Sequence, residues 1–385
     1  MTVKLLFHLN QLGYGGTEKA ILTFCQNLDR EKFTPYLFIY DSDTRIKYFR
    51  YLTLSKLSSR HFKRYKTKYI DSRARLPYFI KSIGRENIFT GDCKKFKEVT
   101  NNILPDIIHF NRGKWEPFYS DLIESCTNSV ACVETNIFGY PAPNHYLAKL
   151  KNLYFVSNWL LKKSNWCENK CKILYNPIKK PCNRESIRKN HGIPDDAFVF
   201  GRISRPDLTD DGFILDVFNQ VKKIQKNAYL IIFAGSDIMR SAARNNTSIK
   251  LINATTDENI LSNFYNSIDV LLHYRIDGET FGMNIAEAMI HGKPVISHYS
   301  HIDNAQAELL AHTPDHGEVG FVAKRNNMDE YINFMDELMA SPEKVKLMGE
   351  NARRRALDLF SEDTVTRYLE SEYMRVLKQV KRTTL

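Results

Sequence analysis

The chain has no long hydrophobic segment. No apolar run in its 385 residues approaches the length of about 18 that a membrane-spanning helix needs. The opening stretch, residues 1–9, is too short to hold the charged and apolar regions of a signal peptide. We therefore expect a protein that is made and kept in the cytoplasm. Its length and its 43% of hydrophobic residues suffice for two sizeable cores.

Paired metal-ligand motifs are also missing. The seven cysteines are an odd number scattered along the chain, which indicates reduced thiols and not a disulfide framework. Cys167, Cys171 and Cys182 come nearest to a zinc site. Their spacing is not a standard one, and no paired Cys or His motif completes it. The sequence therefore predicts no structural zinc.

Acidic residues are scarce in one segment of a chain that is basic overall, with a net charge of +11. Between Arg45 and Arg75 the only acid is Asp71, and aromatic residues are interleaved with the basic ones. The basic residues are Arg45, Lys47, Arg50, Lys56, Arg60, Lys63, Arg64, Lys66, Lys68, Arg73 and Arg75. Such a segment can lie on an anionic membrane surface, and a solvated helix is the alternative. Nucleic acid ranks last, because no recognition motif accompanies the charge.

Short apolar strands alternate with helices along the chain, which predicts an α/β protein with parallel sheets covered on both faces. In the first half we expect strands at Val3–Leu9, Pro35–Tyr40, Ile107–Phe110, Ser129–Val133, Leu153–Val156 and Lys172–Leu174. In the second half we expect them at Phe198–Ile203, Tyr229–Ala234, Ile249–Ile252, Val270–His273 and Pro294–Ser297. After Asn326 the pattern is helical to the end.

The segment Asn176–Asn183 contains two prolines and no periodicity, so it is predicted to link two domains. We place the first domain at residues 1–180, the second at 181–360, and a C-terminal helix at 361–385. Open α/β sheets bind ligands outside the carboxyl ends of their strands. We therefore expect the ligand in a cleft between two facing sheets.

Two glutamates lie on either side of a turn in residues 277–289. Glu279 precedes a helix expected at Met283–His291, and Glu287 lies about one turn into it. The first N–H groups of that helix, around Met283 and Asn284, form an anion site suited to a diphosphate. Glu287 can accept hydrogen bonds from both hydroxyls of a ribose. The alternative is that both glutamates are ordinary surface charges.

Two residues between the glutamates complete this motif. Gly282 lets the backbone approach a ligand closely, and Phe281 precedes it. The helix stop and strand that follow, His291 to Ser297, agree with one βαβ unit. The combination predicts a site for a sugar nucleotide, with Glu279 facing the sugar.

These residues resemble the retaining glycosyltransferases of GT-B fold, and within them family 4. The hallmark of that family is two glutamates separated by seven residues, then Ala-Met and a Gly-x-Pro-Val strand. Here these are Glu279, Glu287, Ala288–Met289 and Gly292–Val295. Shorter matches occur in order at residues 8–19, 105–109, 155–157, 173–178, 200–202 and 232–235.

The resemblance implies two Rossmann-like domains with parallel sheets facing across a cleft. The N-terminal domain would bind the acceptor, the C-terminal domain would bind the nucleotide sugar, and the last helix would cross back to the N-terminal domain. Many family members glycosylate lipid-linked or envelope acceptors and dock on membranes peripherally. The implied partners are thus a nucleotide sugar, a glycan or lipid-linked acceptor, and an anionic membrane surface through residues 45–75, with no nucleic acid.

The resemblance also assigns residues to the donor diphosphate. Arg202 would supply a planar bidentate donor, and Gly15 and Gly16 would let the first domain approach from the opposite wall. In the family a lysine also holds phosphate, but Asp211 stands in its place here. We expect Arg205 to replace that lysine, with an ordinary surface charge as the alternative.

The acceptor side departs further from the family. Many members carry a histidine at the end of the strand equivalent to 107–110, two residues beyond a first histidine. Here His109 matches the first and Asn111 the second, and Asn111 cannot act as a general base. Glu134, expected just after the next strand, also stands near a position that is often histidine. We name no proton acceptor, because the family's same-face displacement lets the leaving phosphate take the proton.

Asp41-Ser42-Asp43 matches the metal-binding Asp-x-Asp of the other major glycosyltransferase fold. It follows only the second expected strand, and short acids are common in turns. We therefore expect an enzyme without metal or other cofactor.

Two hypotheses follow. The first is a retaining, hexosyltransferase-type enzyme that moves a sugar from a nucleotide diphosphate to a hydroxyl, with Glu279 and Asn111 touching the reacting sugars. The second, suggested by Asp211 and Asn111, is a catalytically silent module that binds a nucleotide sugar or a glycan.

Overall fold

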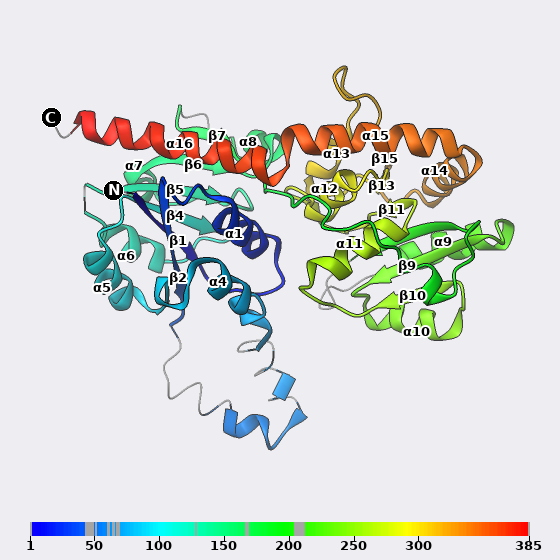
Figure 1. Cartoon of the computed structure of the whole chain (residues 1–385), viewed down its shortest axis with the longest axis horizontal. Helices are drawn as coiled ribbons and strands as arrows, with labels where there is room; N and C mark the ends of the chain where they lie inside the picture. Colours follow the sequence, from blue (N-terminus) through cyan, green and yellow to red (C-terminus); the bar gives the residue numbers. More distant parts are fainter. Residues whose placement is uncertain are drawn as a thin grey trace. The chain divides into compact units, whose positions relative to one another are not determined.

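A computed structural model gives the structure of the chain. It describes residues 2–42, 50, 52–59, 62–63, 66, 70–127, 129–165, 169–203 and 212–383. The chain forms two compact units (Figure 1). Unit 1 consists of Met1–Pro177 and Val365–Leu385, and unit 2 is Ile178–Thr364. The chain thus leaves unit 1 inside the proline-containing segment at 176–183 and returns to it within its last helix.

Unit 1 is built on a seven-stranded parallel sheet with the order β3-β2-β1-β4-β5-β6-β7. Its strands are β1 Val3–Leu9, β2 Phe33–Tyr40, β3 Ile88–Gly91, β4 Ile107–Arg112, β5 Ala131–Asn136, β6 Leu150–Phe155 and β7 Cys171–Ile173. Its helices are α1 Gly16–Asn27, α4 Leu76–Ile83, α5 Cys93–Ile103, α6 Phe118–Glu124, α7 Asn144–Lys149, α8 Asn158–Ser164 and most of α16 Glu362–Thr383.

Unit 2 is built on a six-stranded parallel sheet with the order β10-β9-β8-β11-β13-β15. Its strands are β8 Phe198–Ile203, β9 Ala228–Phe233, β10 Ile249–Ile252, β11 Val270–Leu272, β13 Val295–His298 and β15 Gly320–Ala323. Its helices are α9 Phe213–Ile224, α10 Asp237–Asn245, α11 Glu258–Ser267, α12 Met283–Ile290, α13 Ala305–Leu310, α14 Met328–Ala340 and α15 Pro342–Leu359. A small separate sheet pairs β12 Gly278–Glu279 with β14 Asp303–Asn304.

The prediction of an α/β protein with two parallel sheets is confirmed. Two predicted strand ends are wrong at functionally relevant places. β4 continues past Phe110 to Arg112, and β5 runs from Ala131 to Asn136, so Glu134 lies inside β5 and not after it. Polar residues enter these strands because they pair with each other inside the protein. The edge strands β3 and β15 were not foreseen.

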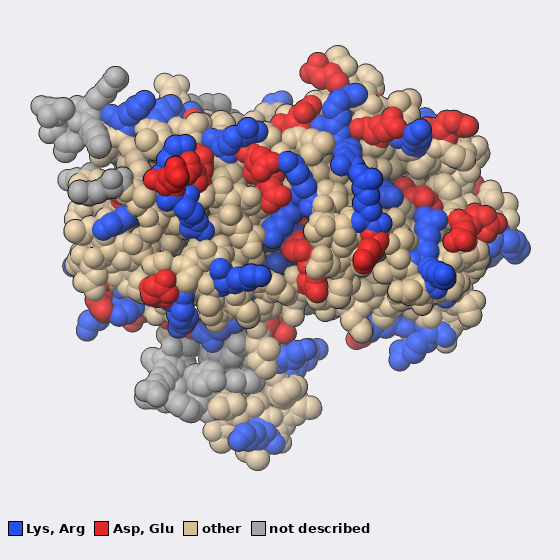
Figure 2. Space-filling view, in the orientation of Figure 1, with Lys and Arg blue, Asp and Glu red and all other residues tan. Residues whose placement is uncertain are grey.

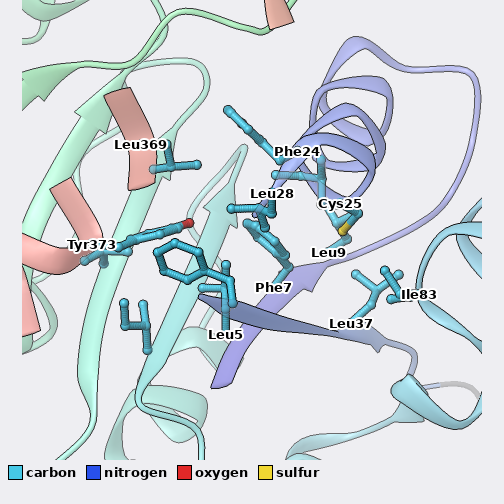
Figure 3. Packing of buried hydrophobic residues seen from close by; sticks show 14 of the residues in the cluster. Leu5, Phe7, Leu9, Phe24, Cys25, Leu28, Leu37, Ile83, Leu369 and Tyr373 are labelled. Carbon is cyan, nitrogen blue, oxygen red and sulfur yellow. The ribbon is translucent and has the colours of Figure 1, made fainter. Parts of the chain in front are cut away.

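The returning helix α16 packs into the core of unit 1, which confirms that it crosses back to this domain. Leu369 and Tyr373 lie beside Leu28 and Phe7 in the buried cluster (Figure 3). The Tyr373 hydroxyl is also hydrogen-bonded to His109 Nδ1 in β4, at 2.5 Å. Asn152 Nδ2 in β6 also donates to Glu372 Oε2 of α16, at 3.0 Å. Apolar burial and buried hydrogen bonds therefore hold α16 on the sheet.

We expect Tyr373→Phe to destabilise the protein by about 1–3 kcal/mol, because it leaves a ring nitrogen of the buried His109 without this partner. Urea unfolding measures the loss. Tyr368→Phe, at an exposed position of the same helix, is the matched control and should change stability by less than about 0.5 kcal/mol. Equal stability of the two variants would contradict this role of Tyr373.

Candidate functional site

The strand order of unit 2 places several polar residues at one edge of its sheet. The chain runs outward from β8 through β9 to β10, then crosses to β11 on the other side of β8. Parallel sheets bind ligands at the carboxyl ends of the strands where the order reverses in this way. Arg202 lies near the end of β8, and His273 directly follows β11. Both therefore lie at the switch point.

A tight turn follows His273. The Gly278 N–H donates to the Arg275 carbonyl at 2.9 Å, which closes the turn over residues 275–278. Gly278 has a φ of 73°, and a Cβ at this position would lie 1.6 Å from the Asp303 carbonyl oxygen. Only glycine fits here. The turn brings Arg275 and Glu279 together, four residues apart.

The Glu279 carboxylate is held by two side chains from this turn and strand. His273 Nε2 lies 3.4 Å from Glu279 Oε1, and Arg275 Nη1 lies 3.4 Å from Oε2. The Glu279 side chain is 17% exposed and that of Arg275 is 36% exposed. Burial alone raises the pKa of Glu279, but the His273 hydrogen bond and the Arg275 charge outweigh it and hold the pKa below its usual value. Glu279 is therefore ionised at neutral pH.

The protonation of His273 follows from its two partners. Burial lowers the pKa of His273 more than the Glu279 carboxylate raises it, so the ring is neutral at pH 7. A carboxylate only accepts hydrogen bonds, so Nε2 carries the proton and donates to Glu279. The other nitrogen, Nδ1, then accepts from the Ser297 hydroxyl at 2.8 Å. Ser297 in β13 thereby fixes the ring that positions Glu279.

Backbone groups of the turn are fixed as well. The Arg275 N–H donates to His298 Nε2 at 3.1 Å, and the Glu279 N–H donates to the buried Gln306 amide oxygen at 3.0 Å. Burial lowers the pKa of His298 to about 4, so its neutral Nε2 can accept from Arg275 while its Nδ1–H donates to the Tyr299 carbonyl at 2.8 Å. The residues around Glu279 are therefore rigidly arranged before any ligand arrives.

The helix after Glu279 begins at a residue that requires glycine. Gly282 precedes α12 with a φ of 99° and has no side chain to cap the helix, while the Asn284 side chain accepts from the Ile285 N–H at 3.0 Å. The first N–H groups of a helix have no partner within it, and here they belong to Met283 and Asn284. With the helix dipole, they favour an anion at this end of α12.

Glu287 lies in α12 and is buried, so it is not an ordinary surface charge. The Tyr265 hydroxyl donates to Glu287 Oε2 at 2.9 Å. The ring of His291 packs on Tyr265 with centroids 4.8 Å apart, and His291 Nε2 lies 3.1 Å from the Ser262 hydroxyl oxygen. Helix α11, which carries Tyr265 and Ser262, therefore orients the carboxylate that the sequence assigned to a ribose.

The structure gives two other predicted donor residues additional roles. Arg202 is buried, and its guanidinium donates to the carbonyls of Ile203 at 2.7 Å and Tyr274 at 2.8 Å. It therefore joins the ends of β8 and β11. Phe281 is also buried, with its ring 5.5 Å from that of Phe360. Arg205 and Asp211 lie outside the described residues.

The remaining predicted residues lie in unit 1. Gly15 precedes α1 and Gly16 begins it. Asn111 lies in β4, is buried, and donates to the carbonyls of His8 at 3.2 Å and His109 at 3.4 Å. Unit 1 thus holds Asn111 and the glycine pair at the carboxyl ends of β1 and β4, where the order of its own sheet reverses.

Glu134, by contrast, is a partner of another buried residue. Arg112 Nε donates to both carboxylate oxygens of Glu134, at 3.0 and 2.9 Å, and the Tyr146 hydroxyl donates to Oε2 at 2.6 Å. Neither side chain of the ion pair is exposed. Arg112 also donates to the carbonyls of Tyr140 and Pro141, so the pair fixes the loop after β5.

Among the described residues, no group of three or more His, Cys, Asp or Glu side chains is arranged to hold a metal ion. Asp41 forms an ion pair with Arg73 at 2.9 Å, while Asp43 and Cys167 fall outside the described part of the chain. In the same described part, no helix is both long and apolar enough to cross a bilayer.

Comparison with known structures identifies the fold. The structure of HepE from Anabaena in complex with UDP matches 97% of this chain and 100% of its own, with a TM-score of 0.69 and 16% identity. A glycosyltransferase from Rickettsia africae matches 98% of this chain and 99% of its own, with a TM-score of 0.68 and 16% identity. The protein has the GT-B fold.

The family model that matches this chain falls within unit 2. Residues 183–355 match the family model "Glycosyl transferases group 1". A capsular polysaccharide biosynthesis glycosyltransferase of Staphylococcus aureus, CapM, is 24% identical over 207 residues, 51% of each chain. An MMP alpha-(1->4)-mannosyltransferase of Mycolicibacterium hassiacum is 28% identical over 102 residues, 26% of this chain and 23% of its own. The matches therefore span about half or less of these relatives.

Sequence reasoning missed the residues that surround the two glutamates. His273 and Arg275 were visible as a histidine and an arginine at a strand end, and this signal could have been used. Tyr265, Ser297 and Gln306 gave no signal, because each reaches the site from another element of unit 2.

The lowered pKa of Glu279 predicts a pH effect on stability. Below pH 4.5, the usual pKa of this group, Glu279 binds a proton in the unfolded chain but remains ionised in the folded protein. The stabilisation is therefore present at neutral pH and is lost as pH falls. We expect the free energy of unfolding of the wild type to fall faster between about pH 5 and 3 than that of Glu279→Gln. Urea unfolding at several pH values tests this, and parallel curves would contradict it.

Proposed function

We propose that this protein is a retaining glycosyltransferase of family 4. It moves a sugar from a nucleotide diphosphate to a hydroxyl group of a glycan or lipid-linked acceptor. The arrangement in unit 2 carries the proposal: an ionised Glu279 held at the start of α12, with a buried, oriented Glu287 one to two turns further along the same helix. Two fixed carboxylates flanking a helix N-terminus suit a donor with two sets of hydroxyls joined by a diphosphate.

The resemblance of unit 2 to glycosyl transferases group 1 supports this donor class. HepE, which shares the fold, has been crystallised with UDP-glucose and with UDP and glucose. In the proposed complex, the diphosphate accepts hydrogen bonds from the N–H groups of Met283 and Asn284. Glu287 accepts from the ribose hydroxyls, and Glu279 faces the transferred sugar.

The proposed chemistry is a same-face displacement. The bond between the anomeric carbon and the phosphate oxygen breaks, and the acceptor oxygen bonds to that carbon on the same face. The acceptor proton passes to the departing phosphate oxygen, so no protein base is needed. Glu279 stabilises and orients the sugar as positive charge develops on it, and the amide of Asn111 binds a sugar hydroxyl. The diphosphate charge is offset by protein groups, and the reaction is proposed to need no metal.

Calorimetry with UDP-, GDP-, ADP- and CMP-sugars tests the donor site directly. We expect micromolar binding of one base class, equal with and without magnesium. Glu287→Gln should weaken that binding about tenfold or more, because it removes a charged acceptor. Glu350→Gln, at an exposed position of α15, is the matched control.

Product analysis completes the test. NMR of the product made from the donor that binds should show the anomeric configuration of the donor. Inversion would contradict the retaining mechanism, and binding that strictly needs magnesium would contradict metal independence. Donor binding without transfer or hydrolysis would favour the alternative, a catalytically silent module.

We further propose that the enzyme is cytoplasmic and docks on an anionic membrane surface through the segment at 45–75. The described part of this segment exposes Leu57, Phe62 and Ile70 next to Lys56 and Lys63. Elsewhere, on the face in Figure 2, basic and acidic side chains are interspersed. Exposed apolar side chains among lysines are typical of segments that lie in a membrane interface. CapM, named for capsular polysaccharide biosynthesis, is compatible with an envelope acceptor.

Vesicle flotation tests the membrane proposal. We expect the wild type to bind vesicles with anionic lipids and to dissociate as salt concentration rises. Replacing both Leu57 and Phe62 by Ala should weaken binding about tenfold or more, because each apolar side chain contributes about 1.5–3 kcal/mol when buried. Ile224→Ala, at an exposed apolar position of unit 2, is the control. Equal binding of all three proteins would contradict the proposal.

A further inference from the structure

A nucleotide diphosphate brings negative charge that the site must offset. The sequence assigned this task to Arg202 and Arg205, but Arg202 is buried and donates to the carbonyls of Ile203 and Tyr274. The family lysine is replaced by Asp211. A further cation near the start of α12 would supply the missing charge.

Arg275 is well placed for this. Its backbone N–H donates to His298, and the carbonyl just before it, on Tyr274, accepts from Arg202. The turn closed at Gly278 fixes its other side. The backbone of Arg275 is therefore anchored on both sides, while its side chain remains 36% exposed.

One glutamate side chain links Arg275 to the start of α12. A Cβ built on Gly282 would lie 3.7 Å from the Glu279 Cβ, so Glu279 packs against the residue that precedes the helix. The carboxylate of the same side chain lies 3.4 Å from the Arg275 guanidinium. The Glu279 side chain therefore contacts both the Arg275 guanidinium and the residue that precedes α12.

We propose that Arg275 is the cation that binds the donor diphosphate in place of the missing lysine. The inference rests on the proposed function and adds a residue to its donor site. In the structure, Arg275 is paired with Glu279. When a diphosphate binds, the guanidinium forms hydrogen bonds with the phosphate oxygens, and Glu279 turns from Arg275 to the sugar. Glu279 thus holds Arg275 in place until the donor arrives.

The alternative is that Arg275 only holds the Glu279 carboxylate in position and does not contact the diphosphate. The two roles differ in what they do to ligands of different charge. A phosphate-binding Arg275 contributes to the affinity for a diphosphate and not to that for the nucleoside alone. An arginine that only pins Glu279 contributes to turnover and leaves the affinity for a nucleotide without sugar unchanged.

Calorimetry with uridine and UDP, or with the corresponding pair for whichever base the wild type binds, separates these roles. We expect Arg275→Gln to weaken UDP binding about 10- to 100-fold and to leave uridine binding unchanged, because a hydrogen-bonded charge contributes about 1.5–3 kcal/mol. Arg275→Lys should weaken UDP binding less than Arg275→Gln does. Arg353→Gln, at an exposed position of α15, should bind both ligands like the wild type.

A second variant tests the competition between Glu279 and phosphate. Glu279→Gln should bind UDP several-fold more tightly than the wild type, since Arg275 is no longer held by a carboxylate. This gain should be smaller in the Arg275→Gln background, and a double-mutant cycle measures the difference. Melting temperatures of all variants identify any that fail to fold. If Arg275→Gln does not fold, the UDP affinity of Arg275→Lys tests the proposal.

Unchanged UDP affinity in both Arg275→Gln and Arg275→Lys would overturn the inference while leaving the proposed function intact. An equal gain from Glu279→Gln with and without Arg275 would also overturn it. If no nucleotide of any base binds the wild type, the proposed function fails first and the inference fails with it.

Discussion

The site in unit 2 depends on one close contact between backbones. At Gly278 the chain passes so near the Asp303 carbonyl that no side chain fits, and this contact pairs the short strands β12 and β14. Gln306 lies just beyond β14 and reaches back to the Glu279 N–H. The turn between Arg275 and Glu279 is therefore fixed from two directions. Apart from Glu287, the charged groups that the proposed chemistry needs are Arg275 and Glu279, and both belong to this turn.

Electrostatics inside the site follows from burial. Two buried histidines, His273 and His298, are neutral because burial disfavours their charged forms. Neutral rings can position groups through hydrogen bonds without adding charge of their own. The ionised Glu279 then needs the Arg275 guanidinium nearby, and the same guanidinium is available to an arriving anion. The backbone of the turn and the two histidine rings are preorganised in this way, and only the Arg275 and Glu279 side chains change partners in the proposed complex.

Unit 1 uses buried polar groups differently. The Arg112–Glu134 ion pair is completely buried, but each partner makes further hydrogen bonds, which offsets the cost of removing both charges from water. The pair fixes the loop after β5. His109 and Tyr373 join β4 to the helix that returns from unit 2. Strand β4 therefore carries Asn111 between two rigidly held neighbours.

Periodicity alone predicted the alternation of strands and helices, because an apolar run bounded by turn residues depends only on nearby positions. The motif from Glu279 to Glu287 was equally local, and its helix begins where predicted, at Met283. The ends of β4 and β5 were placed too early. Their polar residues Arg112 and Glu134 look like loop residues in sequence, and only their pairing across neighbouring strands makes them strand residues.

The sequence by itself determined the two parallel sheets, the position of the glutamate motif and the absence of a long apolar segment. Only the tertiary structure decided what surrounds that motif. Tyr265 and Gln306 hydrogen-bond to Glu287 and Glu279, and Ser297 hydrogen-bonds to the His273 ring that holds Glu279. These three residues come from three other elements, and no spacing in the sequence relates them. The structure also showed that Arg202 is hydrogen-bonded to the carbonyls of Ile203 and Tyr274, and that the Arg275 side chain is partly exposed. The physical reason is that the burial and hydrogen bonds of a side chain depend on which strands become neighbours, and the strand order is set by packing of the whole unit.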